Sequence, residues 1–117
     1  MENANCNHTK HKDIMEKAAA NVPSSDKIAL LADFFKVFGD STRLKIIALL
    51  RHTPLSVCCI ADCLNMEQSA ISHQLKVLRQ NHIVAVEKQG KQSIYSLSDL
   101  HVELVYEMGL DHIMEGK

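Results

Sequence analysis

Residues 56–97 read SVCCIADCLNMEQSAISHQLKVLRQNHIVAVEKQGKQSIYSL, and this stretch decides the fold. Apolar residues at helical spacing predict one short helix over residues 56–64 and a second over residues 67–80. Asn65 lies between them and tolerates the left-handed backbone conformation that a tight interhelical turn needs. The pattern then changes to strands over 83–87 and 92–97, and Gly90 supplies the positive φ of a hairpin turn. Two helices, a tight turn and a β-hairpin, in that order, predict a winged helix-turn-helix.

The second helix of this pair has one apolar face and one polar face. Ile71, Leu75 and Leu78 follow the i, i+4, i+7 spacing of a buried stripe. Small and hydrogen-bonding side chains occupy the other face, as base edges and phosphates in a major groove require, and two lysines flank the hairpin tip. The alternative is an ordinary solvated helix beside a structural hairpin. We expect double-stranded DNA to be bound by Gln68, Ser69, Ser72, His73, Lys76, Lys88 and Lys91.

The rest of the chain predicts four more helices. They cover residues 12–20, 24–38, 40–51 and 99–115, with Pro23, Gly39 and Pro54 as breaks. The predicted architecture is therefore mainly α with a β-hairpin (α+β), in the order ααααα-ββ-α. We expect residues 1–12 to form a mobile N-terminal arm and residues 13–117 to form a single DNA-binding and dimerisation domain.

Composition narrows the class of protein. The 117 residues suffice for one domain, 46% of them are apolar, and no long apolar run predicts a transmembrane span. The polar N-terminus does not resemble a signal peptide, so we expect a cytoplasmic protein. The net charge of −1 gives no overall case for nucleic acid, but residues 67–92 are basic and residues 98–117 are acidic. This uneven charge suits a polyanion partner for the middle of the chain and a cation for its end.

The last predicted helix carries four residues that bind metals well: Asp99, His101, His112 and Glu115. His101 and His112 are eleven residues apart, so they share one helix face but lie roughly 16 Å apart along the axis. Zinc holds imidazole nitrogen at about 2 Å, so one helix cannot close one site with both histidines. A second, antiparallel copy can, because it lays His112 and Glu115 of one chain beside Asp99 and His101 of the other. This spacing predicts a homodimer with two symmetric metal sites.

The residues between these ligands agree with a helix that packs against its twin. The expected contact stripe brackets two apolar residues with polar ligands and consists of His101, Val105, Met108, His112 and Glu115. Ser98 or Asp99 is expected to cap the helix, where non-helical dihedrals let Asp99 and His101 converge. The alternative is an amphipathic helix with surface carboxylates and two incidental histidines.

Residues 35–115 resemble the ArsR/SmtB family of bacterial metal-responsive repressors. The resemblance is carried by residues 38–44 (FGDSTRL), 68–78 (QSAISHQLKVL), the hairpin 88–91 (KQGK) and the spacing of the four terminal ligands, which matches the family's C-terminal-helix zinc site. It implies a homodimer that represses genes of metal efflux or sequestration and leaves DNA when metal binds. It also implies that His112 is coupled by hydrogen bonds to the recognition helix. Zn(II) is the expected ligand, with Cd(II), Pb(II), Co(II) and Cu(I) as alternatives.

The cysteines depart from the family pattern. Some relatives join their N-terminal arm to a Cys-Val-Cys-Asp stretch of the partner chain in a second metal site, and the corresponding residues here are Ser56-Val57-Cys58-Cys59. The residues that remain for such a second site are Cys6, His8, His11, Cys58 and Cys59. Cys59 and Cys63 form an i, i+4 pair that can bind metal without the arm. The alternative is that the cysteines are small semi-buried residues and the arm is disordered.

Two other functions compete with metal-dependent repression. A thiol-based redox or reactive-sulfur sensor on the same fold would use Cys58, Cys59 or Cys63. A metal-buffering protein would bind metal without any role at DNA. We do not expect an enzyme, because the sequence contains neither a nucleophile–base–orienter set nor a phosphate-binding loop.

Overall fold

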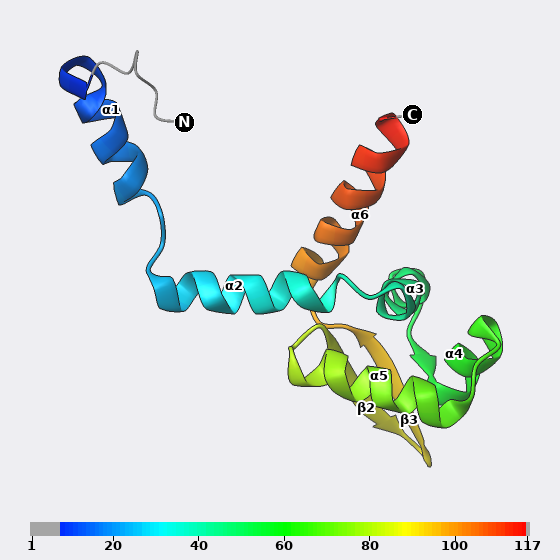
Figure 1. The fold of residues 1–117 in the computed structure, drawn as a ribbon. Helices are drawn as coiled ribbons and strands as arrows, with labels where there is room; N and C mark the ends of the chain where they lie inside the picture. The colour runs from blue at the N-terminus through cyan, green and yellow to red at the C-terminus, as the bar shows by residue number, and fades with distance from the viewer. Residues whose placement is uncertain (1–7, 117) are drawn as a thin grey trace. The chain divides into compact units, whose positions relative to one another are not determined.

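The computed structural model describes residues 8–116, and it confirms the predicted winged helix-turn-helix (Figure 1). Its elements in chain order are α1 (His8–Ala20), α2 (Ser25–Val37), α3 (Ser41–Leu50), β1 (Leu55–Ser56), α4 (Val57–Leu64), α5 (Gln68–Gln80), β2 (Val84–Gln89), β3 (Gln92–Leu97) and α6 (Leu100–Glu115). α4 and α5 are the helix-turn-helix pair, so α5 is the recognition helix, and β2 and β3 form the wing.

The chain divides into two compact units, with the boundary between Asp33 and Phe34. α1 and most of α2 belong to the first unit, and all later elements belong to the second. α1 begins at His8, four residues before the predicted start, and the apolar side chains of Ile14 and Val22 in this unit are exposed. The predicted arm and single domain remain predictions.

The sheet of the second unit contains a short strand that the sequence pattern did not predict. β1, β3 and β2 lie in that order and are all antiparallel, with Leu55 opposite Tyr95 and Val84 opposite Leu97. β1 follows directly after the break at Pro54. A strand of two residues has no measurable alternation, so only its long-range pairing with β3 identifies it.

Local backbone chemistry explains where the helices of the second unit begin and end. The Asp40 carboxylate caps α3 by accepting the N–H of Arg43 at 3.0 Å. Ser56 caps α4 by accepting the N–H of Cys59 at 3.3 Å, so this helix begins one residue after its predicted start. Asn65 has φ 55° and ψ 51°, which confirms the predicted left-handed turn, and Gly90 has φ 66° at the hairpin tip.

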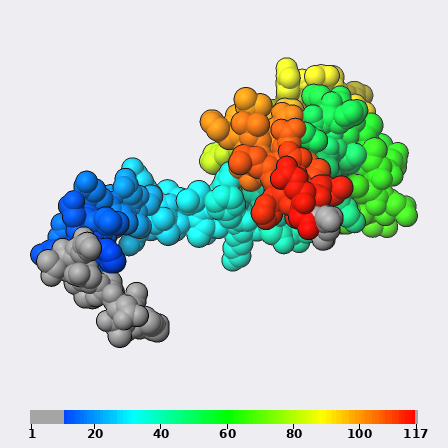
Figure 2. All heavy atoms as spheres, turned by 90° about the horizontal axis from the view of Figure 1, so that it is seen from above, coloured from blue at the N-terminus to red at the C-terminus, as the bar shows by residue number. Residues whose placement is uncertain are grey.

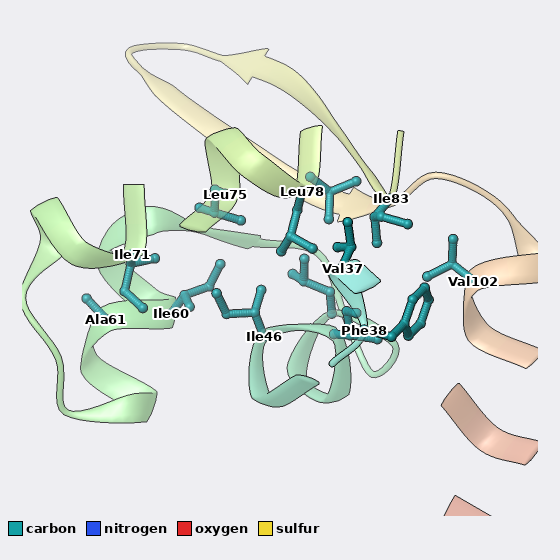
Figure 3. Close-up of a cluster of buried hydrophobic side chains, with 13 residues drawn as sticks. Val37, Phe38, Ile46, Ile60, Ala61, Ile71, Leu75, Leu78, Ile83 and Val102 are labelled. Atoms are coloured by element: carbon teal, nitrogen blue, oxygen red, sulfur yellow. The ribbon is translucent and has the colours of Figure 1, made fainter. Parts of the chain in front are cut away.

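One apolar core holds the second unit together, and every one of its α3–α6 helices contributes to it (Figure 3). The recognition helix buries Ile71, Leu75 and Leu78 completely, which confirms its predicted inner face. Ile46 of α3 is also completely buried, whereas α6 adds only Val102 as a buried side chain. The core therefore determines how α5 sits, whereas it holds only the first half of α6, where Val105 and Tyr106 are partly buried against it.

Candidate DNA-binding surface and metal ligands

The outer face of α5 is exposed and polar. Ser69, Ser72, His73 and Lys76 are all exposed, opposite the buried inner face. The N-cap residue Glu67 makes no side-chain capping hydrogen bond, so the first-turn N–H groups of α5 remain available to an outside acceptor. Backbone N–H groups at a helix N-terminus favour phosphate, so this surface has the chemistry of a groove-reading helix.

The wing completes this surface, and α3 supports α5 from behind. Lys88 of β2 and Lys91 of the hairpin turn are exposed beside the hairpin tip. Behind α5, the Arg43 Nε–H donates to Gln74 Oε1 at 3.0 Å and joins α3 to the recognition helix. The sequence did not reveal this bond, because its two residues are 31 positions apart.

The predicted ligands at the start of α6 lie close together. Asp99, one of the two expected capping residues, is the N-cap, and its Oδ1 accepts the N–H of Val102 at 3.3 Å. The same oxygen lies 3.6 Å from His101 Nδ1, and both side chains are more than half exposed. Two ligands that each lie about 2 Å from a tetrahedral zinc are about 3.3 Å apart. This pair is therefore close to the spacing of two ligands of one ion.

The other two predicted ligands lie at the opposite end of α6. His112 and Glu115 are exposed, as is every residue from Met108 to Gly116, and Figure 2 shows this end of the helix, in red, at the surface of the second unit. Among the described side chains, those of residues 11–116, one chain brings together no group of three or more metal-binding residues. Each end of α6 therefore offers two donors at most.

An apolar groove of about 630 Å³ lies beside His112. Its wall includes Phe35 of α2, Phe38 directly after that helix, Leu44 of α3, and Met108 and Ile113 of α6. Val105, which was expected on the contact stripe, also lines the groove but is partly buried against the core of its own chain. Of the groove residues, the sequence pattern placed only Val105, Met108 and His112, as positions of the contact stripe, because a groove between distant helices has no local signal.

α3 also holds α6. The Arg51 guanidinium donates to Glu107 Oε2 at 2.9 Å and lies 5.3 Å from the centre of the Tyr106 ring. Arg51 is the C-cap residue of α3, so α6 is tied to the end of that helix through two successive side chains. Sequence reasoning missed this contact as well, because its residues are more than fifty positions apart.

The cysteines on α4 are available to solvent. Cys58, Cys59 and Cys63 are exposed free thiols. Ser56, which stands where the second-site pattern has its first cysteine, is 6% exposed and serves as a helix cap. Cys6 lies outside the described residues, and His8 and His11 belong to α1 in the first unit. The predicted second metal site thus remains a prediction.

Comparison with known proteins identifies the family. Residues 40–86 match the arsR family of bacterial regulatory proteins. The chain is 33% identical over 106 residues to a transcriptional repressor SmtB homolog of Synechocystis sp., covering 91% of this chain and 80% of that protein. It is 30% identical over 102 residues to the cadmium resistance transcriptional regulatory protein CadC of Listeria innocua, covering 86% and 85%.

A solved structure supports the same conclusion at the level of the fold. The homodimeric winged helix-turn-helix DNA-binding domain of a Mycobacterium bovis protein superposes with a TM-score of 0.74 at 22% identity, covering 82% of this chain and 92% of that one. No helix within residues 8–116 combines the length and apolar character needed to cross a membrane. The chain belongs to the ArsR family, a family of DNA-binding transcription regulators and not of enzymes.

Proposed function

We propose that this protein is a metal-sensing transcriptional repressor of the cytoplasm. As a metal-free homodimer it binds operator DNA, and it leaves the DNA when Zn(II) binds at two sites shared between the α6 helices of the subunits, which derepresses genes of metal efflux or sequestration. One observation carries the proposal. α6 presents two exposed pairs of candidate metal ligands, one at each end, and within the described residues of one chain neither pair is joined by a third ligand.

The DNA-binding step rests on α5 and the wing. In a symmetric dimer, two recognition helices face successive major grooves about 34–36 Å apart, so the operator is palindromic. Ser69, Ser72 and His73 then contact base edges, together with Gln68 at the helix N-terminus. Lys76, Lys88 and Lys91 neutralise phosphates, so DNA binding weakens as salt concentration rises.

The metal-binding step rests on the chemistry of the donors. Two imidazoles and two carboxylates suit Zn(II), and Co(II) and Cd(II) are the nearest alternatives. A relative named for cadmium resistance supports a metal ion as the signal. When bound, the ion joins Asp99 and His101 of one subunit to His112 and Glu115 of the other. All four positions around the ion are then filled by protein, which is typical of a sensing site and not of a catalytic one.

The dimer contact is proposed along the face of α6 that carries these ligands. Met108 is 70% exposed between the two ligand pairs and lines the apolar groove. Contiguous exposed apolar surface of this kind usually marks an interface. The metal releases DNA only to the extent that it prefers the dimer state with low DNA affinity, a coupling of typically 1–3 kcal/mol.

The exposed thiols of α4 support a second, weaker candidate. Cys58, with Cys59, Cys6, His8 and His11, is proposed as a second site for soft metals such as Pb(II) or Cu(I). Alternatively, Cys58, Cys59 or Cys63 senses oxidants or reactive sulfur, and DNA release then follows oxidant and survives the loss of the α6 histidines. A metal-buffering protein would instead show no salt-dependent binding to its own promoter.

Operator binding by the wild-type protein and by His112→Ala, each titrated with zinc, tests the proposal. We expect equal DNA affinity without metal, and zinc-induced release only in the wild type. Asp111→Ala is the matched control, because Asp111 is the exposed neighbour of His112 and is not a proposed ligand. If His112→Ala binds DNA normally and still releases it on zinc addition, the α6 site is not the switch.

A further inference from the structure

α3 carries an arginine near each end, and both arginines reach another helix. Within residues 11–116, only two side-chain–side-chain hydrogen bonds join different elements: Arg43 Nε to Gln74 Oε1 of α5 at 3.0 Å, and Arg51 Nη2 to Glu107 Oε2 of α6 at 2.9 Å. α3 packs against both α5 and α6, and any direct contact between α5 and α6 is weaker than either of these. α3 therefore stands between the helix that carries the metal ligands and the helix that faces DNA.

We propose that Arg43 and Arg51 are positioning residues that make α3 the link through which a movement of α6 changes the orientation of α5. The inference rests on the proposed function, because it concerns how the metal signal of that function reaches the DNA-binding surface. Neither arginine is a proposed ligand of the metal or of DNA.

At the α6 end, Arg51 contacts two successive residues. Its guanidinium donates to Glu107 and lies against the ring of Tyr106, and Arg51 is the more buried partner of the ion pair, at 29% exposure against 45%. Tyr106 lines the same apolar groove as His112. A rotation or shift of α6 that brings His112 to a shared ion therefore moves the groups that hold Arg51, and a partly buried charge has few other partners to accept it.

At the α5 end, Arg43 is itself held in place. Its N–H donates to the capping carboxylate of Asp40, and its side chain donates to Gln74. Gln74 is half-buried on α5 and directly precedes the buried Leu75, while its other neighbour, His73, is exposed on the outer face. The Arg43–Gln74 bond thus resists rotation of α5 about its axis, and that rotation decides which side chains meet the DNA groove.

A second route between α6 and α5 runs through the backbone. The N–H of Ser98, just before α6, donates to the carbonyl of Ile83 at 2.9 Å, and the N–H of Ile83 donates to Leu78 of α5 at 2.9 Å. This backbone route does not involve α3. Substitution of the arginines therefore interrupts the route through α3 and leaves the backbone route in place.

The experiment measures one ratio for each variant: the operator Kd at saturating zinc divided by the operator Kd in chelator. We expect Arg43→Met and Arg51→Met each to lower this ratio at least fivefold, while the Kd for zinc of the DNA-free dimer changes less than threefold. Arg51→Lys keeps a cation near Tyr106 and Glu107 and should retain most of the ratio. The double variant should lower the ratio no further than the more affected single variant does, because both arginines belong to the same link and breaking it once is enough.

Lys45→Met is the matched control, since Lys45 is an exposed cation of α3 with no ion-pair partner in the described part of the chain. Circular dichroism and sedimentation verify that each variant is a folded dimer, and Glu107→Gln replaces Arg51→Met if the latter does not fold. A wild-type ratio near one overturns the proposed function and this link with it. If the wild-type ratio is large, any one of three results overturns the link alone. Both single variants keep the ratio, Lys45→Met lowers it as much as they do, or the double variant lowers it by the product of the two single losses.

Discussion

α5 and α6 are both long helices of the same unit, but they relate to the core in opposite ways. α5 places Ile71, Leu75 and Leu78 in the core at 0% exposure, while α6 buries only Val102 and exposes every residue from Met108 to its end at Glu115. The inner face of α5 is fully buried within one chain, so its outer face can be polar and available to DNA. The second half of α6 is exposed in one chain, and we propose that a second chain covers it.

The exposed side chains of α6 show what kind of environment it needs. Leu104, Met108 and Ile113 are 40–70% exposed, and together with the adjoining groove they form more apolar surface than a scatter of single residues. Ligand pairs bracket this surface at both ends of the helix. The difference between α5 and α6 therefore separates a part of the fold that one chain completes from a part that we propose two chains complete.

The largest expected effect is on folding stability and concerns the inner face of α5, which is buried within one chain. Leu75→Ala removes a fully buried side chain and leaves a cavity, so we expect the free energy of unfolding to fall by about 2–5 kcal/mol. Urea denaturation at fixed protein concentration measures it. The matched variant Leu100→Ala on α6, where Leu100 is 64% exposed, should cost no more than about 0.5 kcal/mol. Equal losses for both variants would contradict the contrast between the two helices.

The next effect is on the face of α6 that we propose a second chain covers. Met108→Lys places a charge from each subunit near the middle of the proposed contact, so the dimer Kd should rise by about 100-fold, or about 2.7 kcal/mol. The folded unit should persist, because Met108 is 70% exposed in one chain. Sedimentation velocity over a range of concentrations measures the dimer Kd. Ala85→Lys, which adds the same charge at an exposed position of β2, should leave the dimer intact; an intact Met108→Lys dimer would place the contact elsewhere.

The same contrast explains what could be predicted from the sequence about the fold. The buried stripe of α5, the left-handed Asn65 and the Gly90 hairpin depend on residues close together in the chain, and all three predictions were confirmed. The two-residue β1 and the left-handed His82 after α5 were missed. β1 exists only through its pairing with β3. Histidine adopts positive φ more often than most residues, but the conformation is uncommon enough that one histidine does not predict it.

For the candidate site, local chemistry was again predictable and distant contacts were not. The capping role of Asp99 and its approach to His101 followed from spacing at a helix start. The contacts of Arg43 and Arg51, and the groove between α2, α3 and α6, join residues that are far apart in sequence and share no pattern. The metal and DNA ligands remain predictions, because their partners are other molecules.

Asp99 allows a smaller test that separates folding from metal binding within one side chain. Asparagine caps helices about as well as aspartate, so Asp99→Asn should change the free energy of unfolding by only a few tenths of a kcal/mol. Loss of an anionic ligand should nevertheless weaken zinc binding by about tenfold or more, or about 1.4 kcal/mol. Competition with a chromogenic chelator measures the zinc affinity. Unchanged zinc affinity would mean that Asp99 is a cap alone.

The smallest expected effect concerns the outer face of α5. Lys76→Ala should weaken operator and non-operator DNA alike, by about three- to tenfold, and reduce the slope of log K against log salt by about one, because a phosphate contact carries no sequence information. Fluorescence anisotropy at several salt concentrations measures both quantities. Lys45→Ala, an exposed cation of α3 outside the proposed surface, should leave the slope unchanged. If Lys76→Ala instead weakened only operator binding, Lys76 would contact a base and not a phosphate. The outer face of α5 would then read the DNA sequence through a lysine as well as through its small polar side chains.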